Sequence, residues 1–150
     1  MSRFLFVVCL SMVIAACQRE ETKSVEQFYL RPVILPDGTT VHAEVNTQKA
    51  DMGRGMMFRD SFPEGRGMLF IHGTPGLYPY WMYQTKVPLD IIWMDRAGRV
   101  VEISENTPPC TTKASECPNY GGTKEATVVL ELPGGSGRRH GVALGEVIRF

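Results

Sequence analysis

Polar side chains interrupt the most apolar stretch of this sequence, and they are the residues that could do chemistry. The stretch covers residues 79–95 and holds both tryptophans of the chain. Within it, the unbroken apolar run Ile91–Met94 is typical of a strand covered on both faces. Gln84, Thr85 and Asp90 lie in the same stretch, and a polar side chain that becomes buried must be paired. We therefore expect either a binding site or a set of structural hydrogen bonds here.

Trp81 adds an amphipathic aromatic ring to these polar residues. With Arg59, Thr85 and Asp90 it predicts the wall of a ligand site, because small-molecule pockets combine apolar surface with a few converging polar groups. In such a site Arg59 would clamp a carboxylate or phosphate. The structural alternative is that Trp81 and Met82 fill the core while the Thr85 hydroxyl bonds a turn.

Asp90 and His72 form the candidate catalytic pair. A carboxylate and an imidazole that reach a common point could supply the general acid and base of a hydrolase or lyase. The alternative for Asp90 is structural, as an acceptor for backbone N–H groups or as the partner of Arg59 or Arg54. The three histidines of the chain are too scattered for a metal site. We expect neither a metal nor another cofactor.

Short strands and turns must position these residues. Apolar alternation and turn residues predict strands at 28–35, 39–45, 68–71, 126–132 and 146–150, besides the central run. Hairpin turns are expected at 36–38 and 95–98. Asn46 or Thr47 can cap a helix of one to three turns, and residues 136–140 can form another turn of helix. The residues Gly134–Gly137 fit neither a nucleophile elbow nor a phosphate loop and indicate a turn.

These elements predict a mainly β fold, a β-sandwich or jelly-roll-like domain in which antiparallel pairing dominates, with one or two short helices. The length of 150 residues and an apolar content of 43% suit one domain. The charges balance at 16 basic and 16 acidic residues, which does not indicate a nucleic-acid partner.

The N-terminus has the features of a targeting segment. Arg3 precedes an apolar stretch at 4–14 that is too short to span a bilayer, and two alanines come directly before Cys17. Residues 14–17 resemble the bacterial lipoprotein box, which implies that Cys17 is acylated and anchors the chain in a membrane. A plain secretory signal with an incidental cysteine is the alternative.

This interpretation divides the chain into a signal peptide at 1–16, a tether at 17–27 and one domain at 28–150. It predicts a protein of the bacterial envelope that faces the periplasm, at the outer rather than the inner membrane. Cys110 and Cys117 are then the cysteines of the domain, and an oxidising compartment favours a disulfide between them. A metal pair or a redox couple is less consistent with six intervening residues and no nearby histidine.

Several short motifs, taken together, resemble the domain of unknown function 192 family of bacteria and archaea. They are Gly55-Met56-Met57-Phe58-Arg59, Gly67-Met68-Leu69-Phe70, Trp81-Met82, Thr85, Pro88-Leu89-Asp90-Ile91, Asp95-Arg96-Ala97-Gly98-Arg99-Val100 and Pro109-Cys110. The resemblance covers about residues 39–150 and implies a compact β-sandwich of jelly-roll type, often secreted, without an established activity. Tyr83-Gln84 stands where members usually carry Lys-Asn.

Three functions remain open at this point. The first is a non-catalytic envelope module that binds a small polar ligand or an envelope partner beside Trp81, Thr85 and Asp90. The second is an enzyme that uses Asp90 and His72. The third is a structural or assembly protein whose polar residues only fix the fold. The first is our leading hypothesis, and it requires Arg59, Trp81, Thr85 and Asp90 to be neighbours in space.

Overall fold

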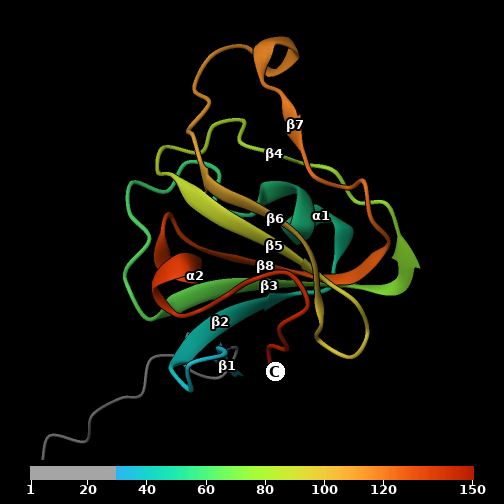
Figure 1. Cartoon of the computed structure of the whole chain (residues 1–150). Helices are drawn as coiled ribbons and strands as arrows, with labels where there is room; N and C mark the ends of the chain where they lie inside the picture. Colours follow the sequence, from blue (N-terminus) through green and yellow to red (C-terminus); the bar gives the residue numbers. More distant parts are fainter. Residues whose placement is uncertain (1–29) are drawn as a thin grey trace, which may run out of the picture.

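A six-stranded sheet organises residues 30–150, the part of the chain that the computed structural model describes (Figure 1). Its strands, in spatial order, are β1 (Leu30–Ile34), β2 (Thr40–Asn46), β3 (Arg66–Gly76), β8 (Ala126–Pro133), β5 (Leu89–Met94) and β6 (Val100–Thr107). A two-stranded ribbon joins β4 (Tyr80–Trp81) to β7 (Asn119–Tyr120). The helical elements are α1 (Lys49–Arg54), the 3-10 turn η2 (Ala114–Glu116) and α2 (Ser136–Arg139).

Most strand pairs are antiparallel, so the predicted mainly β, antiparallel-dominated fold with short helices is confirmed. The hairpins β1–β2 and β5–β6 turn where the sequence predicts, with Gly38 and Gly98 at positive φ. One pair is parallel, β2 with β3, because a crossover containing α1 connects them. In the described chain none of the helices has the length and apolar character needed to cross a membrane. The predicted signal peptide, Cys17 and the tether lie outside these residues.

Apolar side chains pack against both faces of the sheet. The first face carries one buried cluster: Val33, Leu35, Val41, Ala43, Leu69, Ile92, Met94, Val100, Val128, Leu130, Leu132, Val142 and Ile148. The second face carries another: Met56, Met68, Phe70, Met82, Leu89, Ile91, Trp93, Ala126 and Val129. All six residues of β5 are buried, and for Ile91–Met94 this is what the unbroken apolar run predicts. Polar side chains can therefore form one site only if they lie on the same face of the sheet.

The C-terminal segment forms isolated bridges in place of the predicted strand at 146–150. Arg149 exchanges backbone hydrogen bonds with Ile34 at one edge of the sheet, and Val147 bridges to Arg99 near the other edge. A segment that reaches across both edges pairs with each of them only briefly. It thereby covers the first face, where Ile148 is buried.

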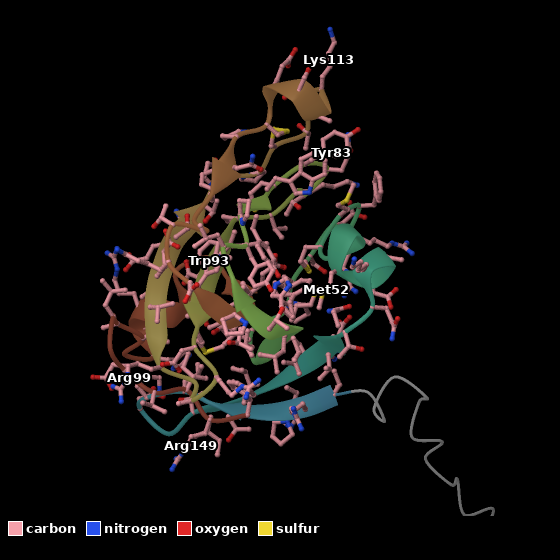
Figure 2. All side chains as sticks on the ribbon, turned by 90° about the vertical axis from the view of Figure 1, so that its right-hand side faces the viewer. Met52, Tyr83, Trp93, Arg99, Lys113 and Arg149 are labelled. Atoms are coloured by element: carbon pink, nitrogen blue, oxygen red, sulfur yellow. A yellow bond between two sulfur atoms is a disulfide. The ribbon has the colours of Figure 1, made fainter. Side chains whose placement is uncertain are left out.

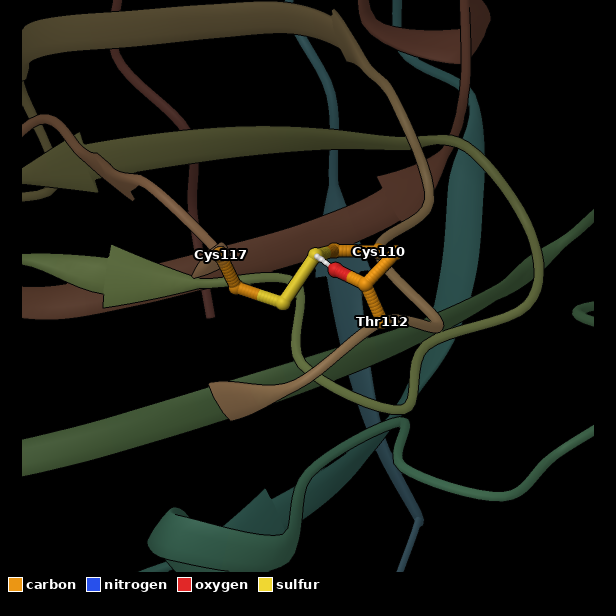
Figure 3. Close-up of a disulfide and its surroundings, with 3 residues drawn as sticks. All are labelled: Cys110, Thr112 and Cys117. Carbon is orange, nitrogen blue, oxygen red and sulfur yellow. Dashed lines mark hydrogen bonds between the residues drawn. A yellow bond between two sulfur atoms is a disulfide. The ribbon is translucent and has the colours of Figure 1, made fainter. Parts of the chain in front are cut away.

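The predicted disulfide between Cys110 and Cys117 is present (Figure 3). Cys110 also bridges to Tyr83 and Thr85, and its carbonyl accepts the Gln84 N–H at 2.8 Å. The crosslink closes a short loop, which by chain entropy is worth about 2.5 kcal/mol. The disulfide constrains the loop itself, and the backbone contacts of Cys110 hold the loop against the segment that follows Trp81.

Candidate functional site

Asp90 is held by three backbone N–H groups. Its carboxylate accepts hydrogen bonds from Asn106 at 2.6 Å, Gly135 at 2.9 Å and Gly137 at 2.7 Å. The side chain is buried, and a Cβ at Gly137 would lie 3.2 Å from its Oδ2 atom, so the loop needs small residues to approach so closely. This geometry corresponds to the structural alternative for Asp90, and its partners are neither Arg59 nor Arg54.

The structure does not bring Asp90 and His72 together. Asp90 pairs with Leu132 in the β5–β8 register, and Leu132 belongs to the cluster on the first face. His72 lies beyond Phe70 on the second face, where its Nε2 is 3.1 Å from the Tyr80 hydroxyl. Alternation along the strands thus sends the two side chains to opposite sides of the sheet. The acid–base pair expected from the sequence is not formed.

The other predicted ligand residues lie on the side of the second face, at different depths. Thr85 is buried, and its N–H bonds the carbonyl of Met82, which is part of the second cluster. Trp81 is 41% exposed and lies against Tyr83, with ring centroids 5.1 Å apart. Arg59 makes a two-pronged ion pair with Glu44, at 2.8 and 2.7 Å. The expected shared locus therefore does not include Asp90.

A polar group that the sequence analysis missed lies on this second face. The buried side-chain atoms Asn46 Nδ2, Arg66 Nε and Glu131 Oε2 have no hydrogen-bond partner within residues 30–150, and we call these three residues the inner cluster. Glu131 lies opposite Met68 across β3 and β8, and Met68 lies opposite Glu44 across β2 and β3. Buried polar atoms without partners are rare in native proteins, so each one is a candidate for ligand contact.

Burial keeps the Glu131 carboxyl in its acid form at neutral pH. Loss of hydration raises the pKa of Glu131 to about 8, and the positive charge of Arg59 only partly opposes this. The hydrogen bond from Arg59 lowers the pKa of Glu44, although partial burial acts in the other direction. The two carboxyls near Arg59 thus differ in charge, with Glu44 ionised and Glu131 neutral.

A pocket opens beside Asn46, whereas Arg66 and Glu131 are not among its lining residues. It has a volume of about 340 Å³. The lining residues are Asn46, Asp51, Arg54, Gly55, Met57, Phe58 and Arg59. The side chain of Arg54 makes no hydrogen bond or ion pair with any residue in the described part of the chain. The pocket therefore places an available guanidinium next to Asn46.

Two strained residues adjoin this pocket. Phe58 and Gln84 both adopt positive φ values, 67° and 54°, and the Phe58 N–H donates to the Gln84 carbonyl at 2.8 Å. Such conformations cost about 1–3 kcal/mol in non-glycine residues and cluster at functional sites. The Phe58 ring is 56% exposed at the pocket rim, which gives a ligand an apolar surface to contact.

Helix α1 covers the second face and is weakly held. Gln48 occupies its N-cap without a side-chain hydrogen bond, so the predicted caps Asn46 and Thr47 are wrong. None of its six residues is buried, although Met52 packs against the second cluster (Figure 2). A helix this short depends on such packing for its stability. Helix α1 is therefore held mainly by the contact of Met52 with the second cluster.

A second, smaller pocket of about 220 Å³ is also lined by residues of α1, and its lining includes Trp81, Tyr80 and His72. Burial lowers the pKa of His72, so its imidazole is neutral at pH 7. No carboxylate lines this pocket, and the residues 30–150 contain no group of three or more His, Cys, Asp or Glu placed to hold a metal ion. This smaller pocket therefore offers a ligand mainly contact with aromatic side chains and with the thioether of Met52.

Comparisons with known proteins agree with the fold. A crystal structure of a protein of unknown function from Novosphingobium aromaticivorans DSM 12444 is 27% identical, with a TM-score of 0.70 over 81% of this chain and 85% of that one. A crystal structure from Sinorhizobium meliloti 1021, named as a proposed transcription regulator, is 27% identical, with a TM-score of 0.67 over 79% of this chain and 89% of that one. No curated protein matches the chain.

A family model also matches most of the domain. It is DUF192, described as an uncharacterized ACR, and the match covers residues 33–150. That range includes all of the sheet except the start of β1, together with both pockets beside α1. On this match the chain belongs to the DUF192 family.

Proposed function

We propose that this protein is a non-catalytic module of the bacterial envelope that binds a small polar ligand in the pocket beside α1. The proposal depends on one observation: two hydrogen-bond donors without partners, from Arg54 and Asn46, lie at that pocket. Arg54 offers a guanidinium with no partner in residues 30–150, and the buried amide nitrogen of Asn46 lacks an acceptor. Sites that bind small molecules fix them with a few such groups.

The exposed ring of Phe58 supports the same location. Phe58 has a strained backbone conformation and bonds Gln84, one of the polar residues within the apolar stretch 79–95. Strain of this kind persists when the surrounding structure holds it. A ligand in the pocket would be within reach of both Phe58 and Arg54, because both residues line it.

Two observations favour binding over catalysis. The acceptor capacity of Asp90 is used by three backbone N–H groups, and His72 lies on the opposite face of the sheet. General acid–base catalysis needs both groups within reach of one reacting atom. The inner cluster, in contrast, offers donors and acceptors without an activated nucleophile.

Replacing Arg54 by alanine tests the pocket. A charge-assisted hydrogen bond contributes about 1.5–3 kcal/mol, so Arg54→Ala is expected to weaken binding of a ligand about ten- to a hundredfold. Ligands would be found by a thermal-shift screen of small polar compounds on the full-length protein in detergent, and their affinities measured by calorimetry. Because Arg54 is exposed, the melting temperature without ligand should stay unchanged.

Arg96→Ala is the matched control, since Arg96 is an exposed arginine in the β5–β6 turn and has no hydrogen bond or ion pair in the described chain. Equal affinities of the Arg54 and Arg96 variants for every ligand found would exclude this pocket as the binding site. A screen without any binder would favour the purely structural function.

The envelope location rests on the lipoprotein box before Cys17. Cells that express the full-length chain and receive radiolabelled palmitate should incorporate label into this protein, and Cys17→Ser should abolish the incorporation, because the thiol is the site of acylation. A Cys9→Ser variant is the control, since Cys9 lies inside the expected signal peptide. Label that persists in the Cys17→Ser variant would contradict the proposed anchor.

A further inference from the structure

The arginines of the described chain fall into two groups. Within residues 30–150, the first group forms ion pairs with carboxylates: Arg59, Arg66, Arg138 and Arg139. The second group forms no ion pair there: Arg31, Arg54, Arg96, Arg99 and Arg149. With the exception of Arg54, this second group belongs to three segments, which are β1, the β5–β6 turn at 95–99 and the C-terminal segment at 144–149.

Hydrogen bonds join these three segments to one another. Arg149 exchanges backbone hydrogen bonds with Ile34 at the end of β1. Arg99 bridges to Val147, and its guanidinium donates to the Gly145 carbonyl at 2.8 Å. The segments therefore form one continuous edge of the molecule. We call its exposed arginines the basic end: Arg31, Arg96, Arg99 and Arg149.

The basic end lies opposite the disulfide loop and carries exposed apolar side chains. Figure 2 shows Arg99 and Arg149 at the end along which the blue ribbon of β1 runs, with Lys113 of the disulfide loop at the other end. Leu144 and Val147, from the C-terminal segment, are 68% and 40% exposed. Arginines around exposed apolar side chains are typical of protein surfaces that bind lipid.

We propose that the basic end docks on anionic phospholipids of the membrane that holds Cys17, and that this contact orients the domain. The inference rests on the lipid anchor proposed above and adds the surface that faces the bilayer. It does not depend on the Arg54 pocket, because none of the four arginines lines that pocket. Arg96→Ala therefore remains a control for ligand binding in detergent.

The proposed anchor brings this end close to the bilayer. Leu30 is the first residue of β1, and residues 18–29 connect it to Cys17. A segment of this length spans at most about 43 Å. Several acyl chains suffice to keep a protein in a membrane, so the arginines do not decide whether it stays there. They decide which end of the domain meets the lipid surface.

The charge at this end favours an anionic surface. The three segments contain four arginines and two carboxylates, Asp95 and Glu146, so two positive charges remain in excess. Asp95 accepts the N–H groups of Ala97 and Arg99 within the turn, and Glu146 is exposed. Each excess positive charge near an anionic membrane favours contact about fivefold. The docked orientation should therefore dominate on anionic lipid but not on neutral lipid.

Chemical modification of the arginines by phenylglyoxal tests this orientation. The acylated full-length protein, purified from membranes in detergent, would be reconstituted into vesicles of phosphatidylcholine alone or of phosphatidylcholine with an equal part of phosphatidylglycerol. Mass spectrometry then gives the rate of modification of each arginine. The basic end should react at least about fivefold more slowly on the anionic vesicles. Arg54, which is also exposed and forms no ion pair in the described chain, should react equally on both.

Salt and charge reversal provide the controls. Salt at about 1 M should remove the protection, because it shortens the Debye length to about 3 Å. Arg96→Glu combined with Arg149→Glu should abolish the protection of the two remaining arginines of the basic end. Arg54→Glu combined with Lys113→Glu makes the same change in charge at other positions and should leave the protection intact. All four substituted positions are exposed, so both variants should fold.

The outcomes separate this inference from the anchor. Equal reaction rates of the basic end on the two kinds of vesicle would overturn the inference and leave the anchor intact. Equal protection of Arg54 would also overturn it, because the domain would then touch the membrane without a preferred orientation. Protein that carries no palmitate label and washes off the vesicles would overturn the anchor and this inference together.

Discussion

Glu131→Gln is expected to stabilise the protein above neutral pH, by an amount that grows as the pH rises. The carboxyl has a pKa of about 8 when folded and near 4.5 when unfolded. Between these values the native state binds a proton that the unfolded state has lost, so the free energy of unfolding decreases with pH by about 1.4 kcal/mol per unit. The wild type should lose on the order of 4 kcal/mol between pH 4.5 and 8 from this group alone.

The glutamine side chain removes this dependence because it carries no titratable proton. Urea unfolding of both proteins at several pH values would measure the difference in their free energies of unfolding. This difference should be small near pH 5 and reach several kcal/mol near pH 8.5, because the raised pKa of Glu131 sets its size. Glu116→Gln is the matched control, because Glu116 is exposed in the disulfide loop, and it should follow the wild type at every pH. Parallel curves for the wild type and Glu131→Gln would show that Glu131 is already ionised in the folded protein.

Glu131 is also the residue that shows where sequence interpretation stops. Alternation in 126–132 assigns Val128, Leu130 and Leu132 to one buried face, which is correct. The intervening Val129 is buried as well, on the second face. That apolar neighbour was the available signal that both faces are covered and that Glu131 is buried with it. A polar residue inside a strand with two apolar faces should be treated like Asp90, as a buried group that needs a hydrogen-bond partner.

Local patterns predicted the parts of the fold that depend on local chemistry. The buried run of β5 and the glycine turns of the two hairpins follow from apolar periodicity and from positive φ. The parallel pairing of β2 with β3 did not follow, because a crossover with a six-residue helix has no strong signature in a single sequence. The inner cluster depends on this pairing, which places Asn46 and Arg66 on adjacent strands.

Asp90→Ala is expected to cause the largest loss of stability among the substitutions considered. It would leave the N–H groups of Asn106, Gly135 and Gly137 without their acceptor. Unsatisfied buried donors that have lost a charged partner cost about 3–5 kcal/mol together, a large part of the stability of a typical domain. The sequence identified Asp90 and the glycine turn separately, but their contact joins residues about 45 positions apart, which a single sequence does not reveal.

The same substitution separates a structural role from a ligand-binding role. Asp90 faces the first side of the sheet, so a folded Asp90 variant should bind the ligand of the Arg54 pocket with wild-type affinity. Asp90→Asn keeps the volume and one acceptor oxygen, and it should lose less stability than the alanine variant and remain folded for this measurement. Unfolding by urea and calorimetric titration of the asparagine variant provide the two readings. A stable Asp90→Asn protein with tenfold weaker binding would place Asp90 in the binding site. A residue that only fixes the glycine turn makes no contact with a ligand on the opposite face of the sheet, so it should not change the affinity.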